Sequence, residues 1–280
     1  MNTDERVYTS KHAAGWGLSV WREMVNEAVS SRELTWRLFM RDFSVRYRQM
    51  ILGVVWTLIT PLISMATFVV LNRSGLLKVG DIGVPYPIFV LLGLTVWQLF
   101  AGGLSVASNA VVAGGSMVVK INFPKETLVL AAMGQVIFEF LVRLAMLAIL
   151  MAVFHVVPKW TAVFFPVMLL PIFIFVLGLG LFLSLSNVLF RDVSKVVGSS
   201  TTLLLFFTPV LYNPPESGLM ATIMRINPLS WLVTAPRDII IKGYLTDSTG
   251  FIWSAGLALV MFFVAWRIFH LVEYKMAEVI

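Results

Sequence analysis

Four arginines in one short stretch are the first residues of this chain whose type and spacing could do chemistry. They lie among large apolar side chains in the segment RLFMRDFSVRYR, and they are Arg37, Arg41, Arg46 and Arg48. On a helix, most of these arginines fall opposite the large apolar residues. A helix of that composition is typical of a membrane surface, where basic side chains reach the lipid headgroups. The segment therefore predicts an amphipathic interface helix on the cytoplasmic side.

Several familiar chemical motifs are absent from the sequence. There is no GxxxxGK[ST] loop, so nucleotide binding by that mechanism is excluded. The histidines, His12, His155 and His270, are far apart on different segments, and the chain has no cysteine for a thiolate site. No Ser-His-Asp arrangement is suggested either. We therefore expect no catalytic residue, no metal site and no cofactor bound by this chain.

The composition predicts an integral membrane protein. Of the 280 residues, 59% are apolar and 13% are charged, and the mean hydropathy is +0.88. The net charge of +6 would suggest nucleic acid in a soluble protein. In a membrane protein the excess of Lys and Arg serves orientation and anionic lipid, so we expect membrane lipid and no nucleic acid as a partner. The first thirty residues lack the pattern of a cleavable signal, so insertion is expected to depend on the spans.

The apolar runs predict six transmembrane helices. About 20 apolar residues cross a hydrocarbon core of roughly 30 Å. On that basis the spans are placed at about 51–71, 88–112, 127–154, 161–190, 196–213 and 249–268. Residues 214–247 are punctuated by prolines and predict two short re-entrant helices on the outer face. Because Lys and Arg gather in the inside segments, both termini are expected in the cytoplasm.

The expected fold is therefore an all-α integral membrane domain over residues 33–280, which opens with the interface helix. A cytoplasmic segment over residues 1–32 precedes this domain.

Four short motifs occur along the chain in a fixed order. RDxxxRYRQxxLGxxWxxxxPL runs from Arg41 to Leu62, FPKE from Phe123 to Glu126, FRDV from Phe190 to Val193, and NPLS from Asn227 to Ser230. Together they closely resemble the permease subunit of ATP-binding-cassette (ABC) exporters for lipid-linked polysaccharides, which carry O-antigen, capsule or wall teichoic acid. The resemblance covers the chain from about residue 33. It departs at Met50, where many relatives carry a small polar residue.

This resemblance implies a homodimer in the cytoplasmic (inner) membrane. Two copies of a separate cytoplasmic ATPase would bind ATP and Mg and supply the energy, so the chain itself is expected to be a transport permease and not an enzyme. The expected substrate is a lipid-linked polysaccharide, with O-antigen preferred over capsule and teichoic acid. A drug or lipid exporter is the alternative within the same class. A membrane-embedded glycosyltransferase is disfavoured because the sequence has no D-x-D pair.

The resemblance also implies a docking segment for the ATPase in the inside loop after the second span. Phe123 would be the apolar anchor and Pro124 the helix break, with Lys120, Lys125 and Glu126 as the polar rim. The alternative is an ordinary basic loop that follows the positive-inside rule.

Aromatic side chains along the translocation path are a further implication of the resemblance. Pyranose rings stack on aromatic rings, and the family draws these from its first, second and fifth spans. The candidates are Trp56, Trp97, Phe100, Phe206, Phe207 and Tyr212. The alternative for aromatics near span ends is anchoring at the membrane interface.

The lipid-linked head is expected to enter near the interface helix. There Arg37, Arg41, Arg46 and Arg48 would bind its pyrophosphate through charge-assisted hydrogen bonds. Anionic phospholipid binding and orientation of the chain are the alternatives for these arginines.

Two opposite charges lie within the third predicted span. Glu139 and Arg143 are four residues apart, so they share a helix face and can pair. We interpret them as a structural ion pair buried between helices. The alternative is a polar contact that faces the translocation path.

Overall fold

The structure is a computed structural model that describes residues 17–48, 55–77, 79–80, 82–121 and 123–279. Every regular element in these ranges is a helix, as the composition predicted. Hydrocarbon offers no hydrogen bonds to a peptide group, so a chain that crosses it satisfies its backbone within helices. The helices are α1 (Leu18–Ser30), α2 (Arg32–Arg48), α3 (Val55–Arg73), α4 (Tyr86–Gly114), α5 (Ser116–Lys120), α6 (Glu126–Val153), the 3-10 helix η1 (Trp160–Phe164), α7 (Phe165–Leu189), α8 (Val193–Phe206), α9 (Leu219–Ile226), α10 (Pro228–Ile241) and α11 (Ser248–Val279).

Five of the helices in the described ranges are long and apolar enough to cross a membrane. They are α3, α4, α6, η1 with α7, and α11. The fifth predicted span, 196–213, is instead the 14-residue helix α8, which begins at Val193 and ends at Phe206. At 1.5 Å per residue it is about 21 Å long, short of a hydrocarbon core of roughly 30 Å. Pro209 gives the reason, since proline disfavours helical geometry in the residue before it and lacks an N–H to donate.

The last helix departs from the prediction in the other direction. The sequence placed the end of the final span near residue 268, whereas α11 continues to Val279. The added turns carry His270 and Glu273, both of which are buried. The charge of Arg267 marked the end of the span in the sequence, whereas the helix continues beyond it and packs through Trp266 against Trp21 of α1.

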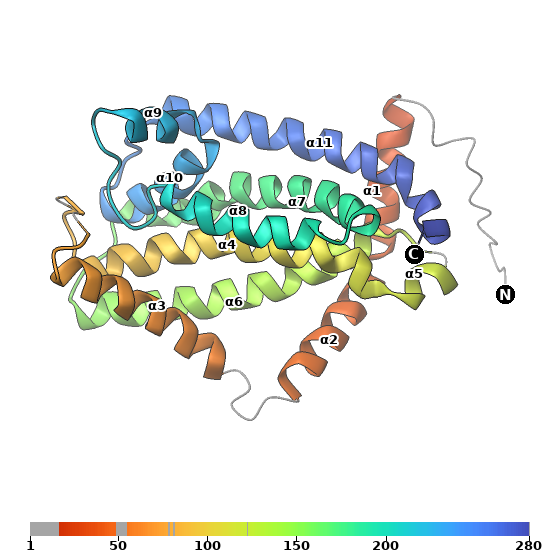
Figure 1. Ribbon diagram of the computed structural model, residues 1–280, viewed down its shortest axis with the longest axis horizontal. Coiled ribbons are helices and arrows are strands. Elements are labelled where there is room, and N and C mark those ends of the chain that lie inside the picture. The colour runs from red at the N-terminus through yellow and green to blue at the C-terminus, as the bar shows by residue number, and fades with distance from the viewer. Residues whose placement is uncertain (1–16, 49–54, 78, 81, 122, 280) are drawn as a thin grey trace.

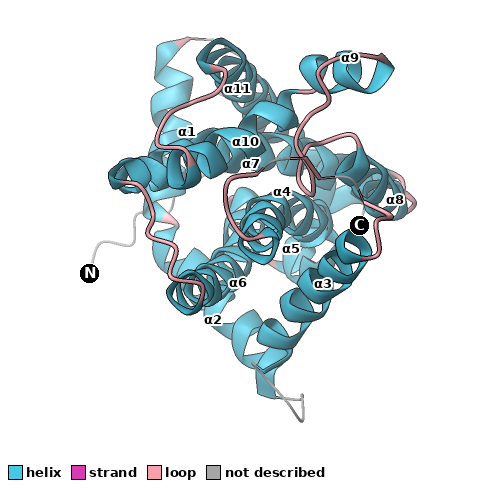
Figure 2. Ribbon diagram, turned by 90° about the vertical axis from the view of Figure 1, so that its left-hand side faces the viewer, coloured by secondary structure: helices cyan, strands magenta, loops and turns pink. Residues whose placement is uncertain are grey.

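The helix α4 lies at the centre of the bundle, with α6 and α7 packed along it (Figures 1 and 2). In the apolar stretch of α4, 72% of the residues are buried, whereas in that of α3 only 6% are. Helices in membranes pack closely where small residues meet. At the contact between α7 and α4, a Cβ added to Gly180 would lie 2.5 Å from the Cβ of Ala107.

The two ends of the bundle are built differently. One end carries the loop between α3 and α4 together with α9 and α10, and the other carries α1, α5 and the end of α11 (Figure 1). The two short helices predicted in residues 214–247 are present as α9 and α10. Buried Arg237 holds α10 in place by donating from Nη1 to the carbonyl of Pro209 over 2.8 Å.

The two N-terminal helices pack against the membrane domain. The interface helix predicted from the arginines is α2, and Phe43 packs against Phe138 of α6 with ring centroids 4.8 Å apart. In the segment predicted as cytoplasmic, Trp21 of α1 packs against Phe263 of α11 at 5.5 Å. The described part of residues 1–32 is therefore docked on the membrane domain.

The contact between α7 and α11 generates a stability prediction. A Cβ added to Gly178 would lie 2.8 Å from the Cα of Phe262, which is backbone and has little room to move. We expect Gly178→Ala to lower the melting temperature, because overpacking typically costs about 1–3 kcal/mol. Thermal unfolding in detergent, followed by tryptophan fluorescence, measures the effect.

The matched control is Gly256→Ala in α11, where an added Cβ meets no atom within 4 Å. Alanine favours helix over glycine by roughly 1 kcal/mol, so this variant should be at least as stable as the wild type. Equal melting temperatures for the two variants would contradict the close approach of α7 and α11.

Candidate functional site

A polar crevice runs along one face of α4. It consists of two adjoining cavities of about 430 Å³ and about 380 Å³, which share Ser105 and Val106 in their walls. The helices α2 and α6 line both cavities, and α8 lines the larger one. The larger cavity contains Arg46 and Glu139, and the smaller one contains Arg41 and Asp42. Two of the arginines predicted to bind phosphate therefore lie in the wall of one crevice.

Glu139 joins the interface helix to the third span. Its Oε2 lies 3.5 Å from Nη2 of Arg143, which is the ion pair that the spacing predicted. Its Oε1 lies 3.6 Å from Nη2 of Arg46, a partner that the sequence reasoning missed. The side chain of Arg143 is 10% exposed and that of Arg46 is 45% exposed. Two cations on one carboxylate leave an excess positive charge at the wall of the crevice.

Neutral polar groups line the rest of the larger cavity. Gln98 and Ser105 come from α4, and Thr201 and Thr202 come from α8. Each threonine hydroxyl donates to the carbonyl of Gly198, over 3.0 Å and 2.9 Å, so its oxygen still has lone pairs to accept a hydrogen bond. An excess cation beside hydroxyl and amide groups suits a ligand that is both anionic and rich in hydroxyls.

The six predicted aromatics do not form one surface within the chain. Trp97 is 4% exposed in the wall of the larger cavity, and Phe100 is buried against Phe175 with ring centroids 6.2 Å apart. Trp56 on α3 and Phe206 on α8 are 48% and 51% exposed. The remaining two, Phe207 and Tyr212, are half-buried, and the Tyr212 hydroxyl donates to the carbonyl of Phe206. Of the six, Trp97 lines the crevice, while Phe100 belongs to the hydrophobic core.

The other two predicted arginines are not in the walls of the crevice. Arg37 pairs with Glu33 at 2.6 Å on an exposed turn of α2, and Arg48 is exposed at the last residue of that helix. Arg41 pairs with Asp42 at 2.8 Å, with both side chains about half exposed. Exposed pairs of this kind contribute little stability, so Arg41 can exchange its partner for a ligand.

The predicted docking segment has a different surface from the expected one. Phe123 is 8% exposed and packs in the hydrophobic core, with the Lys125 ammonium 4.2 Å from its ring centroid. Lys125 and Glu126, predicted as a polar rim, are buried as well, whereas Lys120 is exposed and Pro124 is half-buried. Among the side chains of this segment that the structure describes, Ile121 is the exposed apolar one, at 53%. Phe123 is therefore not offered to a partner, and the docking role of the segment stays a prediction.

Local contacts explain why the two charged residues of FPKE turn inward. Lys125 donates from Nζ to the carbonyl of Ile121 over 3.0 Å, and Glu126 Oε2 accepts a hydrogen bond from Trp266 Nε1 over 3.0 Å. Burial lowers the pKa of Lys125, and the nearby carboxylate of Glu273 opposes that shift. A buried charge is tolerated where such partners are present.

The neutral polar wall of the larger cavity was not predicted from the sequence. Thr201 and Thr202 end the run GSSTT, which interrupts the apolar stretch that became α8. A polar run within an otherwise apolar helix is a departure that the sequence displays, and it marks a candidate for contact with something other than lipid. Gln98 is a single polar residue in α4 and gave no comparable signal.

The charges around Glu139 generate a second prediction. Glu139→Leu leaves Arg143 buried without its carboxylate, and breaking a buried pair in this way costs about 3–5 kcal/mol. Arg46→Gln should cost less than about 1 kcal/mol, since this side chain is nearly half exposed. The double variant Glu139→Leu with Arg143→Met should recover most of the stability. Melting temperatures of the three variants in one detergent rank their stabilities. An unchanged melting temperature for Glu139→Leu would contradict a buried pair between Glu139 and Arg143.

Comparison with known proteins places this architecture in a transporter family. Residues 33–241 match the family model described as ABC-2 type transporter. Among relatives, the O-antigen export system permease protein RfbA of Myxococcus xanthus is 28% identical over 259 residues, which cover 91% of this chain and 98% of that protein. Two Klebsiella pneumoniae proteins of the same name are 25% and 24% identical over 246 residues, 86% of this chain and 92% of each relative. Because the family model spans most of a chain whose described helices form a membrane bundle, the chain belongs to the ABC-2 type transporter family.

Proposed function

We propose that this chain is the transmembrane subunit of an ABC exporter that moves a lipid-linked O-antigen polysaccharide across the cytoplasmic membrane. The observation that carries the proposal is the crevice beside α4. Its wall holds Arg46 and Glu139, the carboxylate that also pairs with buried Arg143, together with hydroxyl and amide groups. A lipid-linked saccharide presents the complementary chemistry, with a pyrophosphate next to sugar hydroxyls. The relatives named as O-antigen export permeases support the same substrate class.

The head of the substrate enters from the cytoplasmic leaflet between α2 and α4. Arg41 lies in the smaller cavity and Arg46 in the larger one, so the two guanidinium groups mark a route along the crevice. Guanidinium groups bind phosphate oxygens in a bidentate manner, which orients as well as attracts the head. The sugar then meets Trp97 and the threonines of α8.

A second copy of the chain completes the path in this proposal. The exposed aromatics Trp56 and Phe206 come from α3 and α8, which lie on the same side of α4 (Figure 2). Only 6% of the residues in the apolar stretch of α3 are buried, so most of this helix is free to contact lipid or another protein. In a homodimer joined through this side, the exposed aromatics of both copies would line a shared route. Each copy would contact one ATPase subunit through the segment after α4, in a membrane where both termini are cytoplasmic.

Export in cells that lack the chromosomal gene tests the proposed substrate. Cells with the wild-type gene restored should display the polysaccharide, and cells without the gene should accumulate lipid-linked polymer inside. Arg41→Gln with Arg46→Gln should reduce display about tenfold or more, because one charge-assisted hydrogen bond is worth about 1.5–3 kcal/mol. The readouts are surface polysaccharide and the internal lipid-linked pool.

The matched control removes two exposed arginines from outside the crevice, Arg22→Gln with Arg32→Gln. If the variant Arg41→Gln with Arg46→Gln displays as much surface polysaccharide as the wild type, at an equal amount of permease in the membrane, these arginines do not bind the phosphate. Unchanged surface polysaccharide after deletion of the gene, combined with altered drug sensitivity, would favour the drug or lipid exporter instead. Loss of capsule or teichoic acid in place of O-antigen would select those substrates.

The docking of the ATPase gives another prediction. Ile121 is exposed next to Lys120, whereas Phe123 is in the core, so truncating these two side chains should have different effects. Ile121→Ala should weaken copurification of the ATPase and leave the melting temperature of the permease unchanged. Phe123→Ala should lower the melting temperature, since truncating a buried phenylalanine costs about 3–5 kcal/mol.

Copurification and thermal unfolding of both variants, prepared from the same membranes, separate docking from folding. Full assembly with Ile121→Ala would place the ATPase contact elsewhere, for which the exposed face of α2 is the next candidate.

A further inference from the structure

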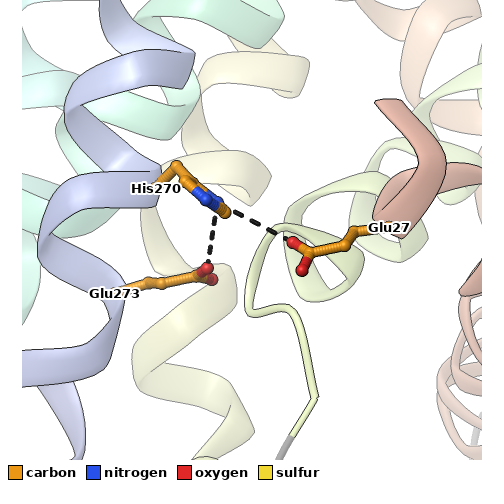
Figure 3. A group of neighbouring side chains, drawn as sticks. All are labelled: Glu27, His270 and Glu273. Carbon is orange, nitrogen blue, oxygen red and sulfur yellow. Dashed lines mark ion pairs between the residues drawn. The ribbon is translucent and has the colours of Figure 1, made fainter. Parts of the chain in front are cut away.

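A buried group of acidic and imidazole side chains lies at the end of the bundle, away from the crevice. Glu27 of α1 meets His270 and Glu273 of α11 (Figure 3). Their relative exposures are 8%, 3% and 6%. One ligand atom from each residue lies within 4.8 Å of the others. We propose that these three side chains bind a divalent transition-metal ion of the Zn²⁺ class, which fastens the two terminal helices together.

The geometry suits such an ion. His270 Nδ1 lies 3.2 Å from Glu273 Oε1 and 3.9 Å from Glu27 Oε2. Zinc binds imidazole nitrogen and carboxylate oxygen at about 2.0–2.2 Å, so ligand atoms in a tetrahedral site are roughly 3.3–3.6 Å apart. The observed distances lie on either side of that range. His270 and Glu273 are three residues apart on one helix face, a spacing that directs two ligands to the same point.

An independent observation comes from Glu126, at the start of α6. This residue is 2% exposed, and it lies close enough to Glu273, His270 and Glu27 to interact electrostatically with all three. Its Oε2 accepts from Trp266 Nε1 over 3.0 Å, while its Oε1 is buried without a hydrogen-bond partner. An unsatisfied buried oxygen is costly and calls for a donor. In this site a water in the fourth metal position donates to Glu126 Oε1.

The surroundings orient the ligands in the way metal sites require. Glu273 accepts at Oε2 from the backbone N–H of Lys125 over 3.0 Å, and this contact turns Oε1 toward His270. Such second contacts fix ligand orientation in known metal sites. Trp21 of α1 packs against Trp266 with ring centroids 6.1 Å apart, which excludes water from one side.

Three carboxyl groups are buried at this end of the bundle, those of Glu27, Glu126 and Glu273. Glu126 is close enough to the other two to interact electrostatically with them. Carboxylates that are buried together repel one another, and a cation bound among them lowers that cost.

The site was not expected from the sequence. The three histidines of the chain are far apart, and that spacing argued against a metal centre. The structure instead joins one histidine to a carboxylate of its own helix and to a carboxylate of α1, more than 240 positions away in the chain. A bound ion would tie α1 and α11 to the start of α6, which begins five residues after the exposed Ile121. The metal therefore holds the base of that exposed segment, whichever partner the segment contacts.

Metal analysis of the purified full chain tests the proposal. The protein is expressed with added Zn²⁺, purified through a tag without histidines, and analysed by inductively coupled plasma mass spectrometry. We expect about one zinc per chain, a lower melting temperature after EDTA treatment, and recovery of that temperature when Zn²⁺ is returned. Both the EDTA treatment and the recovery use the wild-type chain, so neither depends on the folding of a variant.

Two ligand variants and a matched control make the assignment specific. His270→Gln and Glu27→Gln should each weaken Zn²⁺ binding by at least about tenfold, measured by competition with a chromogenic chelator. Their melting temperatures should no longer respond to EDTA. The control is His155→Asn, because His155 lies outside the cluster and has a φ of 54°, which asparagine tolerates. This control should bind Zn²⁺ like the wild type.

Three outcomes would overturn the proposal. The first is wild-type protein with less than about a tenth of an equivalent of zinc and no thermal response to Zn²⁺. The second is equal zinc binding by His270→Gln and His155→Asn. The third is a thermal response to pH but not to metal, which would assign a protonated imidazole to the centre of the cluster. The metal measurements do not depend on the polysaccharide export test, so the two proposals are tested independently.

Discussion

The absence of hydrogen-bonding partners in hydrocarbon is the constraint on which the rest of this structure depends. It forces the apolar runs into helices and removes the hydrophobic driving force that would otherwise hold those helices together. Association then rests on close packing, and the helix α4 is the element that packs on most sides. Glycines such as Gly180 and Gly178 allow α7 to approach α4 and α11 closely. The crevice lies along α4 where α2, α6 and α8 surround it.

Charged side chains then determine how the surface helix meets the bundle. Arg46 reaches from α2 to Glu139, which also holds Arg143 within the membrane domain. A carboxylate shared by two arginines ties the interface helix to the third span and leaves positive charge beside the crevice. The same residues thus contribute to structure and to the electrostatics of a binding site, so the structural and functional interpretations of the ion pair are compatible.

Buried polar groups also join α1 and α11 to the start of α6. Trp266 and the backbone of Lys125 connect α11 to the start of α6, and Glu27 brings α1 to the same place. This arrangement explains why Lys125 and Glu126 turn inward although their loop was predicted to present them to a partner. Of the side chains described in this segment, Lys120 and Ile121 remain exposed.

The sequence by itself determined the helical membrane class, the helix that carries the four arginines and the pairing of Glu139 with Arg143. Each of these depends on local composition or on helical spacing, which a sequence displays directly. Tertiary structure decided the placement of Phe123 in the core, the contact of Arg46 with Glu139, and the meeting of Glu27 with His270 and Glu273. These features join helices that are distant in the chain, and no residue spacing encodes which faces will meet. The early end of α8 could be predicted in part. Pro209 is a helix breaker in the sequence, but the apolar residues around it favoured a longer span.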